Sequence, residues 1–246
     1  MADTAIAPLP SSLGLPGMHL SHCADWVTLA FETPHRVLSS AVLGGGISHS
    51  QRWLNLRVSG AAVHESPQTT LATLCRRQGW EANTVAMMTA ASMASLRVRH
   101  TTLGKETLMV LVTAGLSNAR RAGDPAEYRL LCSGPPPEPG TINLALVTSI
   151  PLSDAALVES ALVATEAKAA LLQELGIRSP VSGAIATGTG TDAIAVFAGQ
   201  GPVAVHYAGK HTLFGEAVAR LVLSALADAI RQSGPLIDDI HIGEPR

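Results

Sequence analysis

Charged and aromatic side chains are scarce in this sequence of 246 residues, at 15% and 3% of the total. The formal net charge is -2, and lysine and arginine never cluster beyond the pairs Arg76-Arg77 and Arg120-Arg121. Proteins that bind nucleic acids carry a basic patch, and those that bind single strands add aromatic side chains on which bases stack. The sequence therefore excludes nucleic acid as an expected partner.

Cysteines are few, and long apolar runs are lacking. Cys23, Cys75 and Cys132 lie far apart, with no C-x-x-C spacing, so neither a disulfide framework nor a thiolate zinc site is indicated. No stretch approaches the roughly 20 apolar residues that a membrane span needs, and the N-terminus lacks a basic segment followed by an apolar run. We therefore expect a cytoplasmic protein with no membrane partner.

Apolar residues, by contrast, make up 47% of the chain, which is enough for one domain with a substantial core. Residues 1–24 open on a stretch rich in proline, glycine and serine, which we interpret as a loose N-terminal arm. We expect a single domain over residues 25–235 and a C-terminal tail over residues 236–246.

Short β-branched and apolar runs outnumber the helical patterns. Strands are predicted at 26–31, 36–43, 52–58, from 84, and at 97–101, 107–113 and 142–148. Helices are predicted at 70–78, at 154–175 after a Ser153 cap and before Gly176, and at 212–231 with Thr212 as the cap. Because strands and helices do not alternate strictly, we predict an α/β (α+β) layered fold, with a mixed β-sheet core packed by helices.

The string TGTGTD, residues 187–192, interrupts an apparently buried β region. It formally matches the G-x-G-x-x-A dinucleotide fingerprint, but the residues that follow favour a strand rather than the required helix. Two glycines let a backbone approach its neighbours closely, and Thr189, Thr191 and Asp192 would place hydroxyls and one carboxylate there. From the residues alone, a tight turn and a functional site remain equally open.

Two further polar clusters flank this string. In the helix 154–175, the 3.6-residue period puts Val158, Leu162 and Thr165 on one predicted core stripe, with Lys168 on its flank and Glu166 toward water. Lys210 and His211 stand where the last helix begins, a position that suits an anion or a developing oxyanion as well as simple capping.

A third set of polar residues, Ser117, Asn118 and Asp124, follows the predicted strand 107–113. The ends of strands in α/β proteins commonly carry ligand-binding groups. No H-E-x-x-H string occurs, so a catalytic zinc site has little support.

Several longer strings resemble the adenosylcobinamide amidohydrolase family, in the family's order over roughly residues 36–230. These strings are SSAVLGGG (39–46), MMTAAS (87–92), TAGLSNARRAGDPA (113–126), GTINLALV (140–147), TEAKAALLQELG (165–176), ATGTGTDAIAV (186–196) and AGKHTLFGE (208–216). The resemblance implies hydrolysis of the amide between the corrin propionate and the aminopropanol arm, giving adenosylcobyric acid and 1-amino-2-propanol in cobamide salvage. It implies a small-molecule corrinoid as the partner and no cofactor or protein-bound metal, since the corrinoid carries its own cobalt; a homo-oligomer is compatible with it.

The chemistry of amide hydrolysis suggests roles for the polar residues of these strings. We expect His211 to be the general base or acid, oriented by Asp192, and Glu166 and Lys168 to form a charge pair near the scissile bond. The expected substrate-binding residues are Ser117, Asn118, Asp124, Asn143, Thr189, Thr191 and Lys210.

Within this set, Asn118 or Asn143 would donate to the oxyanion. Thr189, Thr191 or Ser117 would be a hydroxyl nucleophile, unless water attacks directly. The alternatives are a corrinoid-binding protein without hydrolytic activity, using the same loops, and a phosphate-handling enzyme using Lys210 and the glycine-rich string.

Overall fold

The computed structural model describes residues 17–58, 66–80, 83–126 and 140–242. Within them, nine strands form one mixed sheet in the order β11-β5-β6-β8-β10-β2-β3-β4, with β1 paired to β2. These strands are β1 (Met18–His22), β2 (Trp26–Ser39), β3 (Gly46–Arg57), β4 (Thr84–Thr89), β5 (Arg97–Leu103), β6 (Glu106–Ala114), β8 (Ile142–Thr148), β10 (Ala193–Ala198) and β11 (Ile237–Asp239). The predicted mixed sheet packed by helices is confirmed.

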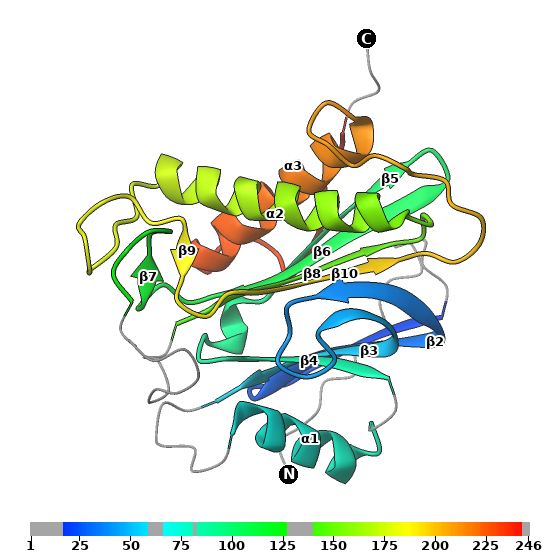
Figure 1. Cartoon of the computed structure of the whole chain (residues 1–246), viewed down its shortest axis with the longest axis horizontal. Helices are drawn as coiled ribbons and strands as arrows, with labels where there is room; N and C mark the ends of the chain where they lie inside the picture. Colours follow the sequence, from blue (N-terminus) through cyan, green and yellow to red (C-terminus); the bar gives the residue numbers. More distant parts are fainter. Residues whose placement is uncertain (1–16, 59–65, 81–82, 127–139, 243–246) are drawn as a thin grey trace.

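The sheet curves back on itself, so that its two halves face each other across an apolar core (Figure 1). Val27 of β2, Trp53 of β3 and Met87 of β4 come from one half, and Met109 of β6 and Phe197 of β10 from the other. All five side chains are fully buried or nearly so. Burial on this scale is the main favourable term in folding.

Helices cover both outer faces of the folded sheet (Figure 1). Helices α2 (Asp154–Glu174) and α3 (Leu213–Arg231) pack side by side over β6, β8 and β10, and α1 (Pro67–Gln78) packs on β4. In the described part of the chain, no helix is long and apolar enough to cross a membrane.

Helix ends follow local sequence signals, of which Ser153 and Thr212 were predicted as caps. The hydroxyls of Ser66, Ser153 and Thr212 each accept a hydrogen bond from a backbone N–H of the first turn of α1, α2 and α3. Gly79 ends α1 in the left-handed conformation, at φ 68°, where a residue without a side chain is least strained. The three predicted helices are therefore confirmed, with α1 beginning three residues earlier than expected.

Both predicted termini need correction. Met18–His22 forms β1, paired antiparallel with β2, and Ile237–Asp239 forms β11, paired with β5. Residues 18–22 therefore do not belong to a loose arm, and residues 237–239 of the predicted tail belong to the sheet, because strand pairing satisfies backbone groups that composition alone does not reveal. Pro34, expected to separate two strands, instead lies within β2, where the register with β3 shifts between Ala30 and His35. A proline is tolerated at such an irregularity because no ladder bond needs its N–H.

The predicted core stripe of α2 is also wrong. Val158, Leu162 and Thr165 are exposed, whereas Val163 and Ala167 are among the residues that α2 buries. Apolar residues surround most of this helix, so periodicity alone does not select the buried face.

Candidate active site

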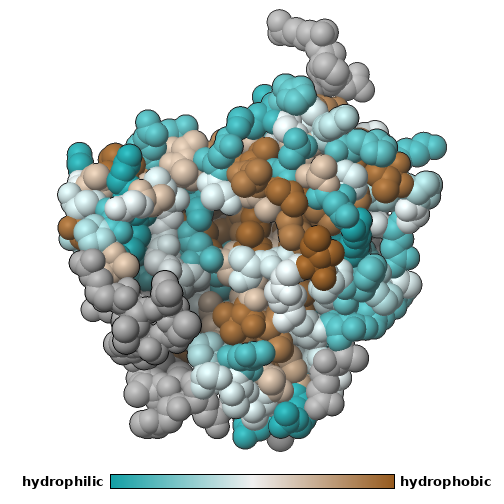
Figure 2. Space-filling model, viewed as in Figure 1, coloured by the Kyte–Doolittle hydropathy of each residue, from teal (hydrophilic) through white to brown (hydrophobic). Residues whose placement is uncertain are grey.

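A cleft of about 230 Å³ opens between α2 and the first residues of β8 and β10. Figure 2 shows apolar side chains gathered in the middle of this face, around a hollow. The residues lining the cleft are Ser40, Ile142, Leu144, Ala164, Thr165, Lys168, Asp192, Ala193 and Ile194. Lys168 and Asp192 are the only charged residues among them, so the cleft is a mostly apolar cavity with one ion pair.

Lys168 of α2 donates from Nζ to the Asp192 carboxylate. Both side chains are 14% exposed. The carboxylate is held from three further directions: the Thr189 hydroxyl donates to it, as do the backbone N–H of Thr189 at 3.0 Å and that of Ile142 at 2.9 Å. An acceptor satisfied in this way is fixed in position, so Lys168 is a pre-positioned cation in a poorly hydrated site.

The glycine-threonine string, residues 187–192, lies against this ion pair and leaves room for it. A Cβ atom on Gly188 would lie 2.4 Å from the Asp192 carboxylate and 3.0 Å from Lys168 Nζ, so only glycine fits beside the pair. Gly188 and Thr189 form the short strand β9, paired with β7 (Ala119–Arg120). The string is thus a turn that places polar groups around the ion pair.

Thr191 makes hydrogen bonds to the two residues that precede β8. Its hydroxyl lies 2.7 Å from Thr141 Oγ1 and donates to the Gly140 carbonyl oxygen at 3.0 Å. Thr141 lies in the string GTINLALV (140–147) but was not among the predicted site residues. The signal that could have found it is a small hydroxyl residue between a glycine and a buried β-strand.

Ser117 and Asn118 also lie close to Gly140. A Cβ atom on Gly140 would lie 2.4 Å from Asn118 Oδ1 and 2.7 Å from Ser117 Oγ. The structure therefore places these two predicted residues against the Gly140–Thr141 peptide, on the chain that also leads into the cleft at Ile142.

Asn143 does not take the predicted part of an oxyanion donor. Its Nδ2 donates to Asn55 Oδ1 and to the Met88 carbonyl, both at 2.8 Å, and Asn55 in turn donates to the Thr113 hydroxyl at 2.8 Å. Both of its N–H bonds are therefore used inside the core, because β3, β4, β6 and β8 meet there. Asn143 Oδ1 is buried with no hydrogen-bond partner among the described residues.

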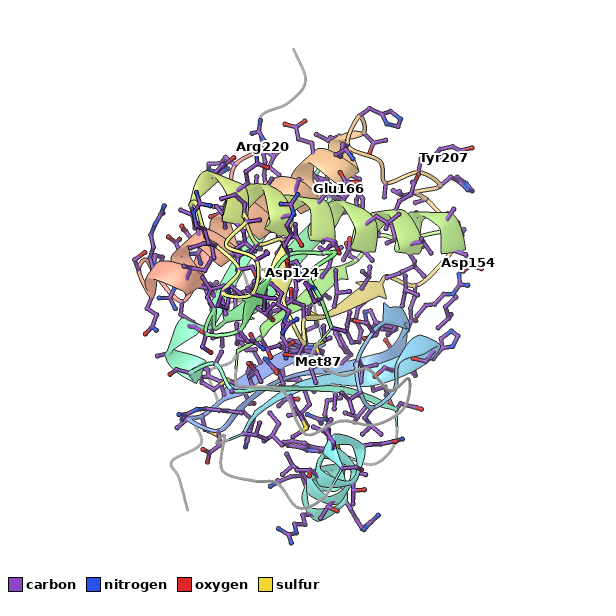
Figure 3. All side chains as sticks on the ribbon, turned by 60° about the vertical axis from the view of Figure 1, so that its left-hand side comes forward. Met87, Asp124, Asp154, Glu166, Tyr207 and Arg220 are labelled. Carbon is purple, nitrogen blue, oxygen red and sulfur yellow. The ribbon has the colours of Figure 1, made fainter. Side chains whose placement is uncertain are left out.

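The charged residues that we expected near the scissile bond form other ion pairs than predicted. Glu166 accepts from Lys210, not from Lys168, and both side chains of this pair are more than half exposed. Figure 3 labels Glu166 on α2, the helix that also carries Lys168 on its cleft side. His211 is exposed, and the Asp192 carboxylate is occupied by Lys168, Thr189 and Ile142, so the predicted His211–Asp192 contact is absent from the described residues.

Asp124 braces a loop rather than lining the cleft. It accepts from Ser179 Oγ at 2.5 Å and from the Arg121 backbone N–H at 2.9 Å. Hydrogen bonds from the Ser179 and Ser182 hydroxyls, with that backbone N–H, hold the pKa of Asp124 below its usual range. In Figure 3, Asp124 lies below α2, among loops.

Metal ligands are not gathered in the described segments: no group of three or more histidine, cysteine, aspartate or glutamate residues there could hold an ion.

The fold and the cleft define a mixed α/β protein of a known architecture. A beta-aminopeptidase from Burkholderia sp. shares it with a TM-score of 0.51 over 93% of this chain and 89% of that chain, at 14% sequence identity. This likeness concerns the fold alone.

The chain belongs to the adenosylcobinamide amidohydrolase family, whose sequence pattern it matches over residues 15–236. The adenosylcobinamide amidohydrolase of Methanosarcina mazei is 28% identical over 79% of this chain and 90% of its own length. An uncharacterized protein of Methanocaldococcus jannaschii is 35% identical over 58% of this chain, and the match spans 61% of that protein. The resemblance found in the sequence is confirmed, and the family is one of amide hydrolases.

Proposed function

We propose that this protein is an adenosylcobinamide amidohydrolase that cleaves the amide between the corrin propionate and the aminopropanol arm. The products are adenosylcobyric acid and 1-amino-2-propanol, and the reaction returns salvaged cobinamide to cobamide synthesis. Family membership supports the substrate class, and the Lys168–Asp192 pair in an apolar cleft is the observation that carries the chemistry.

The ion pair suits the electrostatic demands of amide hydrolysis. As the carbonyl carbon becomes tetrahedral, negative charge develops on its oxygen, and a fixed cation in a poorly hydrated site stabilises that charge strongly. Lys168 is such a cation, because Asp192 holds it and is itself held by Thr189 and Ile142. The same ammonium can give a proton to the departing amine.

The cleft fits the reacting arm rather than the whole substrate. Its volume of about 230 Å³ is below the roughly 300 Å³ at which pockets begin to enclose drug-sized ligands. The aminopropanol amide would enter the cleft and the corrin ring would lie outside it. Val158, Leu162 and Thr165 recur along α2 at spacings of four and three residues, so they share one face, and Thr165 lines the cleft. Val158 is 44% exposed and Leu162 57%, which makes this face an apolar wall for the ring.

The test is incubation of the purified protein with adenosylcobinamide, followed by mass spectrometry of the products. Release of cobyric acid together with aminopropanol supports the proposal. Unchanged substrate that elutes with the protein supports the alternative, a corrinoid-binding protein without hydrolytic activity. A Lys168→Met variant serves as the control, since it keeps an unbranched side chain of nearly the same length and removes its charge.

We further propose that the protein works in the cytoplasm on the free corrinoid, without its own metal or cofactor, since the cobalt arrives in the substrate. Turnover that survives prolonged dialysis against a chelator supports this. Loss of turnover that added metal restores would contradict it.

A further inference from the structure

We propose that the chain cuts its own Gly140–Thr141 peptide bond, with the Thr141 hydroxyl as the nucleophile. The inference rests on two hydrogen-bonded hydroxyl groups, those of Thr141 and Thr191. The Thr191 hydroxyl donates to the Gly140 carbonyl oxygen at 3.0 Å and lies 2.7 Å from Thr141 Oγ1. Because the Thr191 proton points at the carbonyl, Thr141 is the donor in the second contact. A proton leaving Thr141 therefore has a route through the Thr191 hydroxyl to the Gly140 carbonyl oxygen.

The peptide on either side of this bond is held in place. The backbone N–H of Ile142 donates to Asp192 at 2.9 Å, and the carbonyl of Thr141 accepts from the Gly115 N–H at 3.1 Å. Thr141 is only 4% exposed. A nucleophile that is fixed against its target carbonyl reacts with much of the entropy of encounter already removed.

Gly140 is surrounded by polar groups that a side chain would displace. Asn118 Oδ1, Ser117 Oγ and the Asn118 backbone nitrogen all lie within 2.9 Å of the position that a Cβ atom would take. Glycine is thus required directly before Thr141, and the bond that it forms lies in a polar setting able to respond to charge on the carbonyl.

The proposed reaction balances with water as the only co-reactant. Thr141 Oγ1 bonds to the Gly140 carbonyl carbon, and its proton passes through Thr191 to the carbonyl oxygen. The bond from that carbon to the Thr141 nitrogen then breaks, and the nitrogen takes up the proton and becomes a free amine. Water hydrolyses the resulting ester, which restores the Thr141 hydroxyl and leaves Gly140 as a carboxylate.

The cut would create an activated nucleophile. A terminal α-amine next to a threonine hydroxyl can act as the base for that hydroxyl. Thr141 is adjacent to Ile142, which lines the cleft, so the new terminus would serve the amide hydrolysis proposed above. This consequence rests on the proposed function, whereas the cut itself does not.

Intact-mass spectrometry of the purified full chain, with N-terminal sequencing, tests the cut. We expect two fragments whose masses add to that of the chain plus one water, the second beginning at Thr141. Thr141→Val should abolish the cut and Thr141→Ser should retain it, since serine keeps the hydroxyl. Thr148→Val is the matched control, because it removes a buried hydroxyl from the other end of β8 and should leave the cut unchanged.

Thr191→Val gives the mechanistic readout. It breaks the proton route, so the cut should slow at least tenfold, and hydroxylamine added to the uncut chain should leave a hydroxamate at Gly140 by trapping the ester. An intact wild-type chain, or a Thr141→Val variant that is still cut, would overturn the proposal. An intact chain that hydrolyses adenosylcobinamide would refute only the cut, and a cut chain without turnover would refute only the proposed function.

Discussion

The Lys168 ammonium and the Asp192 carboxylate form an ion pair that joins α2 to the start of β10, across 24 residues of sequence. The pair lines an otherwise uncharged cleft, and backbone N–H groups hold its carboxylate. This geometry makes Lys168 the cation of the site and Asp192 the residue that positions it.

Removing either charge should therefore abolish most of the activity. We expect Lys168→Met and Asp192→Asn each to lower kcat for adenosylcobinamide by about two orders of magnitude or more, the usual size of such effects. Lys105→Met is the control, because Lys105 is an exposed lysine in the turn between β5 and β6, at the opposite end of the sheet. Near-normal kcat in both site variants would refute their roles.

Gly188→Ala and Gly190→Ala form a matched pair within one string. A Cβ atom on Gly188 would lie 2.4 Å from the Asp192 carboxylate, whereas one on Gly190 would meet its nearest atom at 3.6 Å, an ordinary contact. Gly188→Ala should lower kcat at least tenfold by displacing the ion pair, and Gly190→Ala should change it less than about threefold. Equal effects in steady-state assays would show that the string does not act through the ion pair.

His211→Ala tests the histidine that the sequence favoured as base. Because His211 is exposed and the partners of Asp192 lie elsewhere, we expect kcat to fall by less than about threefold. A loss of about two orders of magnitude, with unchanged thermal unfolding, would restore its predicted role.

Two half-buried histidines should make the fold sensitive to acid. Burial lowers the pKa of His35, and it lowers the pKa of His100 despite the nearby carboxylates of Asp239 and Asp238. The folded protein then binds fewer protons than the unfolded chain, so stability rises with pH and is lost as pH falls from about 7 toward about 5. Urea unfolding should show this slope in the wild type and a flatter one in His35→Gln/His100→Gln, with the exposed His49→Gln as the control. Equal slopes would contradict the assignment.

Arg99 tests a buried ion pair outside the site. Its guanidinium is 0% exposed and donates to Asp228 of α3 at 2.7 Å. Asp228→Asn should lower the free energy of unfolding by about 2 kcal/mol, below the range for a fully buried pair because Asp228 is 29% exposed. Glu216→Gln breaks the exposed pair with Arg220 on the same helix, and should cost less than about 0.5 kcal/mol in the same denaturation series.

Local signals were enough to locate most of the secondary structure. The strand at 142–148 was predicted to the residue, and Ser153 and Thr212 cap their helices as expected. Such signals act over a few residues, so the sequence displays them directly. Strand β11 was missed because it has three residues and pairs with β5, far away in the chain. Strand β1 was missed because it follows a stretch rich in proline, glycine and serine, although its partner β2 comes directly after it in the chain.

The sequence by itself determined the composition of a layered α/β core, the helix caps and the polar residues from which the site is built. Only the tertiary structure decided the pairing of those residues: Lys168 with Asp192, Glu166 with Lys210, and Thr191 with Thr141. The physical reason is that each pair joins segments 24 to 50 residues apart, brought together by packing α2 on the sheet and by the register between β8 and β10. The spacing of residues along the chain does not reveal the register between β8 and β10.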